Sequence, residues 1–317
     1  MKTKFLTFAA LVAMMASCSS ENDFIKEDEG KPQPITVTAS VAELNTRAGY
    51  ETPDGGTEVL PKNFYLTITQ DDTEGSQYNY TNKKLTLGDN NQYAYDGTMY
   101  WKRATPSPTA VTAYTIEGTE VSVQKDQTTM ENVLASDLLG AKLNDGVTIN
   151  GNNISVAFRH LLCKLDVTVK WGTELDNMTS KKFTGVTLYG LNCANATLDR
   201  TTATVSTENA TVDDIKAFAT ISNSECVAEA IFLPSSTANP IIVIHTEIQK
   251  PTEQTASVRN FQISINAPDG GFVAGSRYTA DVIVGGTVVG NVQANIKEGW
   301  VNANEEEIET DENQATE

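Results

Sequence analysis

The sequence predicts an all-β protein built from two β-sandwich domains in series. Apolar residues alternate with polar ones in many short runs, which is the pattern of strands with one buried face. Turn-forming Gly, Pro, Asn and Asp residues separate these runs, and long helix-forming runs are few. A length of 317 residues with 39% hydrophobic residues is enough for two packed cores.

In the first half, alternation predicts a series of strands, and Asp96-Gly97 predicts a hairpin turn between two of them. The stretch 131–142, ENVLASDLLGAK, is the best candidate for a short helical turn in this half. Strands are expected at 65–70, 85–87, 93–95, 99–102 and 111–115.

The apolar pattern changes phase near Arg159-His160. Apolar residues occupy even positions over 154–158 and odd positions over 161–171. A shift of one residue turns every side chain to the other face, so the chain must bulge or pass from one packed sheet to another. We therefore predict a domain boundary near residue 165, which separates domains at 48–165 and 166–300.

The second half continues in the same style, with Gly285-Gly286 as a turn and Pro234 and Pro240 around a loop. Six further strands are expected there, at 183–191, 227–233, 241–248, 261–265, 278–284 and 288–296.

The first residues predict export. Lys2 and Lys4 precede an apolar run over 5–15, and small residues lead to Cys18. This pattern is typical of a bacterial signal peptide, here 1–17, with a lipoprotein cleavage site. Cys18 falls where lipidation needs it, so we expect an N-terminal cysteine acylated with palmitate rather than an incidental cysteine. The apolar run is too short for a permanent membrane span.

An acidic tether over 18–34 is expected to follow, and then a strand with one buried face. Full burial of its three large aliphatic side chains would contribute roughly 4.5–9 kcal/mol, against a net domain stability of about 5–15 kcal/mol. Loss of this strand would therefore leave an unsatisfied groove; a permanent first strand is the alternative. Its inward residues are Ile35, Val37, Ala39 and Val41.

Arg47 is a lone basic residue in a turn-prone stretch, where a protease can enter. We expect cleavage between Arg47 and Ala48, so residues 35–47 form the removable strand and its junction. At the other end, residues 301–317 are acidic with few apolar side chains, and we expect a solvated tail.

The net charge is −18, and −20 without the signal peptide, which excludes nucleic acid as a partner. After Cys18 three cysteines remain, so at most one disulfide can form. Their apolar neighbours favour buried free thiols. These cysteines are Cys163, Cys193 and Cys226.

No enzyme site is predicted. The two histidines, His160 and His245, lack a metal-binding spacing, and the chain has no G-x-S-x-G nucleophile motif. Both histidines are expected to be packed or hydrogen-bonded in the structure. We expect no cofactor and no bound metal.

Several sequence blocks, by their order and spacing along the chain, resemble those of the fimbrillin-like lipoproteins of Bacteroidales, which are subunits of type V pili. The block 158–167, FRHLLCKLDV, is similar to the family's F-x-H-x-x-x-K-L-x-V, and 272–279, FVAGSRYT, is similar to its A-G-x-x-Y. Asp137-Leu138-Leu139 and Trp300 resemble two shorter elements. The resemblance spans nearly the whole chain and implies transthyretin-like Greek-key β-sandwiches.

The resemblance also implies a mechanism. The precursor is lipidated, anchored at the outer membrane and cut after an arginine by a maturation protease. The first strand then leaves, and a donor strand from another pilus subunit fills its groove. The expected function is surface adhesion at the fimbrium, with a host or bacterial surface ligand.

Two points stay open. The first is the role of the subunit, because stalk, tip and anchor roles fit the sequence equally. The second is the donor strand: only Val301 and Ile308 are large and apolar in the tail, which makes the tail a poor donor strand. The resemblance implies that another C-terminal strand, such as 288–296, can serve as the donor. The alternative function is a glycan-binding surface lipoprotein of the outer membrane.

Overall fold

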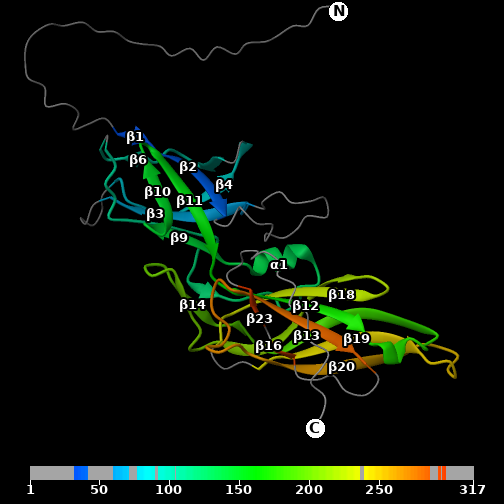
Figure 1. Cartoon of the computed structure of the whole chain (residues 1–317). Helices are drawn as coiled ribbons and strands as arrows, with labels where there is room; N and C mark the ends of the chain where they lie inside the picture. The colour runs from blue at the N-terminus through cyan, green and yellow to red at the C-terminus, as the bar shows by residue number, and fades with distance from the viewer. Residues whose placement is uncertain are drawn as a thin grey trace, which may run out of the picture.

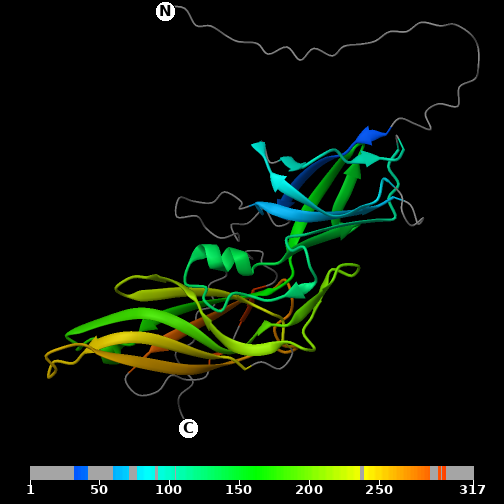
Figure 2. The same ribbon diagram turned by 180° about the vertical axis from the view of Figure 1, so that it is seen from behind.

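The computed structural model describes residues 32–41, 60–70, 77–89, 92–103, 105–235, 239–285, 292–293 and 295–297. Over these residues the chain is almost entirely β-structure, so the all-β prediction is confirmed. The strands form two lobes, which Figure 1 shows one above the other and Figure 2 shows from behind. The number of domains and a Greek-key strand order remain predictions.

The N-terminal lobe is an eight-stranded sheet that closes on itself in the order β10-β11-β2-β5-β4-β3-β7-β9. Its interior is one hydrophobic cluster that extends in sequence from Val37 to Phe158. A two-stranded sheet, β1-β6, lies beside it. The strands are β1 (Gln33–Pro34), β2 (Thr36–Val41), β3 (Asn63–Thr69), β4 (Tyr80–Leu87), β5 (Gln92–Tyr95), β6 (Tyr100–Trp101), β7 (Ala110–Tyr114), β9 (Leu139–Leu143), β10 (Gly146–Asn150) and β11 (Asn153–His160).

The C-terminal lobe contains two five-stranded sheets, β17-β18-β12-β21-β23 and β16-β13-β19-β20-β22, and a small sheet β15-β14-β8. A second hydrophobic cluster fills this lobe. Its elements are β8 (Glu120–Val121), α1 (Met130–Ser136), β12 (Cys163–Trp171), the 3-10 helix η2 (Thr173–Leu175), β13 (Ser180–Ala194), β14 (Ala196–Asp199), β15 (Thr204–Ser206), β16 (Thr211–Lys216), β17 (Phe218–Ile221), β18 (Glu225–Phe232), β19 (Ile241–Gln249), β20 (Ser257–Asn266), β21 (Arg277–Val284), β22 (Val292–Gln293) and β23 (Asn295–Lys297).

The phase change marks the passage between lobes. Phe158 belongs to the first cluster, while Leu161 and Leu162 belong to the second. Because β11 and β12 lie in different sheets, the chain moves from one packed sheet to another, as the alternation predicts. A domain boundary at residue 165 itself remains a prediction.

A second connection runs through residues 115–138. This segment leaves β7, packs on the C-terminal lobe and returns to the closed sheet at β9. The fully buried Gln127 acts as a strand partner, because its amide accepts from the Ile231 N–H at 2.8 Å and donates to the Ile231 carbonyl at 2.7 Å. The predicted helical turn is confirmed as α1, whose first turn is capped by the Thr129 hydroxyl.

Arg200, between β14 and β15, ties the lobes together. Its guanidinium donates to the carbonyls of Ile116 at 2.7 Å and Gly118 at 2.9 Å, and also to the side chain of Asn82 on β4. The Tyr114 hydroxyl donates to the Arg200 carbonyl at 2.7 Å. These bonds fix the C-terminal lobe against two strands of the closed sheet.

Tyr114 provides a test of this contact. Burial raises the pKa of its hydroxyl to about 12, from 10.0. Between these pH values the folded chain keeps a proton that the unfolded chain loses, so the free energy of unfolding should fall as pH rises through this window. We expect Tyr114→Phe to flatten that fall relative to the half-exposed control Tyr95→Phe, measured by urea unfolding across the window. Parallel curves for both variants would contradict this assignment.

Candidate functional site: the slot of the first strand

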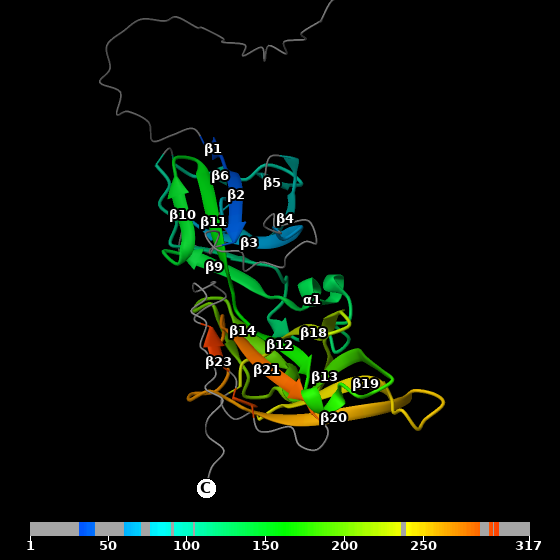
Figure 3. The same cartoon turned by 45° about the vertical axis from the view of Figure 1, so that its right-hand side comes forward.

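Strand β2 lies inside the closed sheet, between β11 and β5 (Figure 3). All six of its residues pair in parallel with β11, from Thr36 opposite Asn153 to Val41 opposite Phe158. On the other side it pairs antiparallel with β5 over two residues. Removal of β2 would therefore open the sheet and expose two strand edges, which are templates for another strand.

The inner face of this slot is apolar and aromatic. Val37 is 3% exposed, and its pairing partner on β11 is the fully buried Ile154, while the equally buried Val156 pairs with Ala39. Phe64 packs edge-to-face on Phe158 at 5.1 Å between ring centroids and on Tyr93 at 4.7 Å. These rings and aliphatic groups form a dry floor that favours small or branched apolar side chains on the bound strand.

Of the four inward residues predicted from the sequence, only Val37 is fully buried. Ile35, Ala39 and Val41 are half-buried, although all three pack against the same cluster. Burial of Val37 contributes about 1.5–3 kcal/mol, so the side chains hold β2 less strongly than full burial of three would imply. The strand is also held by its backbone pairing with β11 and β5.

The outer face of β2 carries a polar ladder. The Thr36 hydroxyl donates to Asn153 Oδ1 at 3.0 Å, and Asn153 Nδ2 donates to the Thr38 hydroxyl at 3.3 Å. The Ser155 hydroxyl accepts from Asn153 at 2.9 Å and lies 3.4 Å from Thr38. Asn153 therefore joins two residues of β2 to its neighbour on β11.

The start of the strand is also fixed. The Ile35 N–H donates to the Met99 carbonyl at 2.8 Å, and Asn152 Nδ2 donates to the Pro34 carbonyl at 3.0 Å. The Asn152 carbonyl in turn accepts from the Thr36 N–H at 3.1 Å and from the indole of the buried Trp101 at 3.2 Å. The entry of the slot is thus built from the β10–β11 turn and β6.

A groove of about 300 Å³ lies on the outer side of the sheet. The residues that line it are small, and those with outward side chains on β2 are Thr38 and Ser40. Its lining comes from β2, β10 and β11 alone: Thr38, Ala39, Ser40, Gly146, Thr148, Ser155, Val156 and Ala157.

Among the predicted site residues, Cys18, Arg47 and Ala48 lie outside the described residues. The slot residues that the sequence did not single out are Asn152, Asn153 and Ser155. Their polar side chains belong to a usual alternation of polar and apolar residues. Nothing in the local sequence indicates that β2, more than 100 residues away, pairs with them.

The family-like blocks of the sequence meet at the junction of the lobes. His160 Nδ1 lies 2.9 Å from Asp137 Oδ2, and both side chains are nearly buried. The Gly275 N–H donates to the Leu162 carbonyl at 2.8 Å. Gly275 has φ +72°, and a Cβ there would lie 3.0 Å from the His160 carbonyl oxygen, so glycine fits this close approach. These blocks hold β11, the wall of the slot, to the C-terminal lobe.

Both histidines are hydrogen-bonded, as predicted. His160 contacts Asp137, and His245 lies between the Thr187 hydroxyl at 2.9 Å and Asn260 at 3.0 Å. The three cysteines are buried free thiols, which confirms that prediction. Burial raises the pKa of Cys226 to about 11, so this thiol is protonated and a poor nucleophile.

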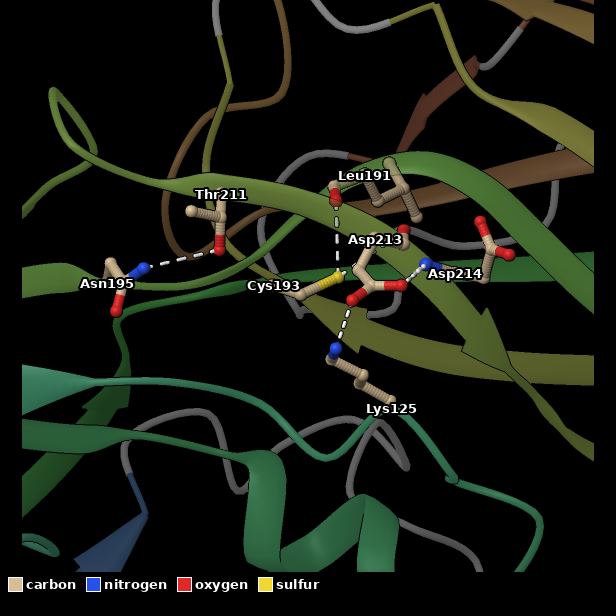
Figure 4. A network of polar contacts seen from close by, with 7 residues as sticks. All are labelled: Lys125, Leu191, Cys193, Asn195, Thr211, Asp213 and Asp214. Carbon is tan, nitrogen blue, oxygen red and sulfur yellow. Dashed lines mark hydrogen bonds and ion pairs between the residues drawn. The ribbon is translucent and has the colours of Figure 1, made fainter.

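The segment 115–138 is fixed to the C-terminal lobe by a polar network around Cys193 (Figure 4). Asp213 accepts from Lys125 and from the Asp214 N–H, and these bonds lower the pKa of its carboxyl group. The Cys193 thiol donates to the Leu191 carbonyl at 3.2 Å, and burial raises its pKa to about 11. The network has no free nucleophile and acts as a structural tie.

Within the described ranges, no group of three His, Cys, Asp or Glu side chains is placed to hold a metal ion. None of the helices in that part of the chain has the length and apolar character to cross a membrane.

Fold and slot together define a class: two-lobed β-proteins in which an N-terminal strand completes the first sheet. The chain belongs to the fimbrillin-like family, whose model matches residues 46–300. The match includes the central and late blocks that meet at the junction.

Solved structures agree on the fold. A protein named for cell adhesion from Bacteroides uniformis is 21% identical, with a TM-score of 0.55 over 85% of this chain and 99% of that one. Another from Bacteroides ovatus is 13% identical, with a TM-score of 0.58 over 86% and 100%. A fimbrial protein from Bacteroides vulgatus is 14% identical, with a TM-score of 0.54 over 86% and 100%. No curated protein matches the chain.

Proposed function

We propose that this chain is a structural subunit of a surface fimbrium that serves adhesion and assembles by strand exchange. The observation that carries the proposal is the position of β2, inserted in a closed sheet and paired over all six residues with β11. Membership of the fimbrillin-like family and the likeness to fimbrial and cell adhesion proteins support the same role. The role is structural rather than catalytic.

In this proposal the precursor is exported as a lipoprotein and anchored at the outer membrane through Cys18. A maturation protease cuts between Arg47 and Ala48, and β2 leaves with the tether. The partners are other pilus subunits and a surface ligand. The family match begins at residue 46, beside the proposed cut, which supports a mature chain that starts there.

The C-terminal strands supply the donor. Val292, Ala294 and Ile296 alternate with polar residues in the same way as Val37, Ala39 and Val41 of β2. Among the described residues of its own subunit, the donor segment pairs over two residues at β22 and over three at β23. A slot in the next subunit would offer this segment the six-residue ladder that β2 makes with β11.

Arg47→Ala tests the maturation step. In a Bacteroides envelope we expect the wild-type chain to begin at Ala48 and to form a ladder of oligomers, since the cut frees the slot. The variant should keep residues 18–47, stay attached to the membrane and remain monomeric. N-terminal sequencing and gel electrophoresis without heating measure both outcomes.

The control is Arg103→Ala, which removes an exposed arginine of the described residues and should mature normally. An R47A chain that still begins at Ala48, or a wild-type chain that keeps its tether while it polymerises, would overturn the proposed maturation step.

A further inference from the structure

The outer groove of the slot is not filled by the strand that now occupies it. Thr38 and Ser40 of β2 border a space of about 300 Å³ that is open to solvent. An occupant with longer side chains at these two positions would fill more of the groove. We propose that this groove selects the donor strand of a second copy of this chain through Gln293 and Asn295, an inference that rests on the proposed function.

The donor is placed by its pattern. Aligned on the inward residues, the segment 292–296 (VQANI) matches 37–41 (VTASV), with alanine at the centre of both. Gln293 then takes the place of Thr38, and Asn295 takes the place of Ser40. Both replacements are longer and carry an amide that donates and accepts hydrogen bonds.

The groove offers space and hydrogen-bonding groups for side-chain amides. Its floor depends on Gly146, which has φ +86°, because a Cβ there would lie 2.4 Å from the Ala157 carbonyl oxygen and 3.0 Å from the Ala141 Cβ. The Thr148 and Ser155 hydroxyls line the groove and can bond to an amide. On β11, Asn153 already links two outward residues of the bound strand and would do the same for the donor.

The donor comes from a second copy. Within one subunit, β22 and β23 pair with β20 and β21 of the C-terminal lobe, while the slot lies in the closed sheet of the N-terminal lobe. The donor segment of one subunit therefore cannot occupy both places at once. The two segments share Val, Ala and a β-branched aliphatic residue at their inward positions, so their outward residues are what distinguish the donor from the strand it replaces.

Peptide binding to the cut chain, with residues 1–47 removed, tests the inference. The probe is a labelled peptide of residues 290–297, followed by fluorescence anisotropy. A second peptide carries Gln293→Thr and Asn295→Ser, which restores the outer face of β2. We expect it to bind about tenfold more weakly, as for the loss of one to two hydrogen bonds.

A matched variant keeps the groove itself under test. Ala157→Leu should fill the groove from the β11 side and abolish the preference between the two peptides. The peptide with Gln293→Thr and Asn295→Ser should bind this variant as tightly as it binds the wild type. Equal binding of both peptides to the wild type, or a preference that survives in A157L, would overturn the inference and leave strand exchange intact.

A third peptide, with residues 33–41, distinguishes a failure of the proposed donor selection from a failure of strand exchange itself. If neither this peptide nor the 290–297 peptide binds the cut chain, the slot does not exchange strands and the proposed function itself fails. Binding of the 33–41 peptide alone would show a working slot and exclude residues 290–297 as its donor.

Discussion

Val37→Asp is expected to release β2 from its slot in the uncut chain. Val37 is the one inward residue of the strand that is fully buried, and Ile154 and Val156 of the slot floor are equally excluded from water. A carboxylate there would lose about 1.5–3 kcal/mol of burial and would face the apolar and aromatic side chains of the cluster that the structure describes around Val37. We expect a loss of about 3–5 kcal/mol from the free energy of unfolding of the N-terminal lobe, measured by urea unfolding.

Thr38→Asp is the matched control. It places the same charge one residue along the strand, on the half-exposed outer face, and should change stability much less. Because a chain with V37D could also fail to fold, a peptide of residues 33–41 provides the second measurement. Added in trans, it should restore the stability of V37D. Equal effects of the two aspartates would mean that β2 does not close the core.

Lys164→Ala is expected to destabilise the C-terminal lobe by about 3–5 kcal/mol. The Lys164 side chain on β12 is 5% exposed and forms ion pairs with Glu229 and, at 3.6 Å, with Asp166. Arg277 of β21 forms a further ion pair with Asp166. Removal of the ammonium group leaves carboxylates in a site that water reaches poorly, which is more costly than the loss of an exposed pair.

Lys170→Ala on the same strand provides the comparison. Its ammonium group lies 3.5 Å from Glu225, but the two side chains are 62% and 36% exposed, so the change should cost less than about 1 kcal/mol. Urea unfolding of both variants, monitored by tryptophan fluorescence, measures the difference. Similar losses for the two lysines would show that the buried cluster is hydrated and contributes no more than a surface pair.

The two sites are connected through the junction. β11 forms one wall of the slot and continues directly into β12, which carries Lys164. The His160–Asp137 contact and the Gly275 hydrogen bond to Leu162 hold this passage on both sides. If strand exchange joins subunits at the slot, load on the donor strand passes to the C-terminal lobe through these contacts and through Arg200.

Some of the slot could be predicted from the sequence. Alternation at 35–41 and 154–158 correctly assigned the faces of the two strands, because a period of two depends only on local backbone geometry. The phase change at Arg159-His160 correctly marked the passage between sheets. The apolar sequence neighbours of Cys163, Cys193 and Cys226 were enough to predict that these thiols are buried.

Only the tertiary structure decided which strands meet. The parallel pairing of β2 with β11 joins residues more than 100 positions apart, and its short pairing with β5 joins residues more than 50 positions apart. Alternation says which face of a strand is buried but not which neighbour it has, since any strand can supply the same hydrogen bonds. The groove over Gly146 arises from three strands at once, so no single segment of the sequence contains it.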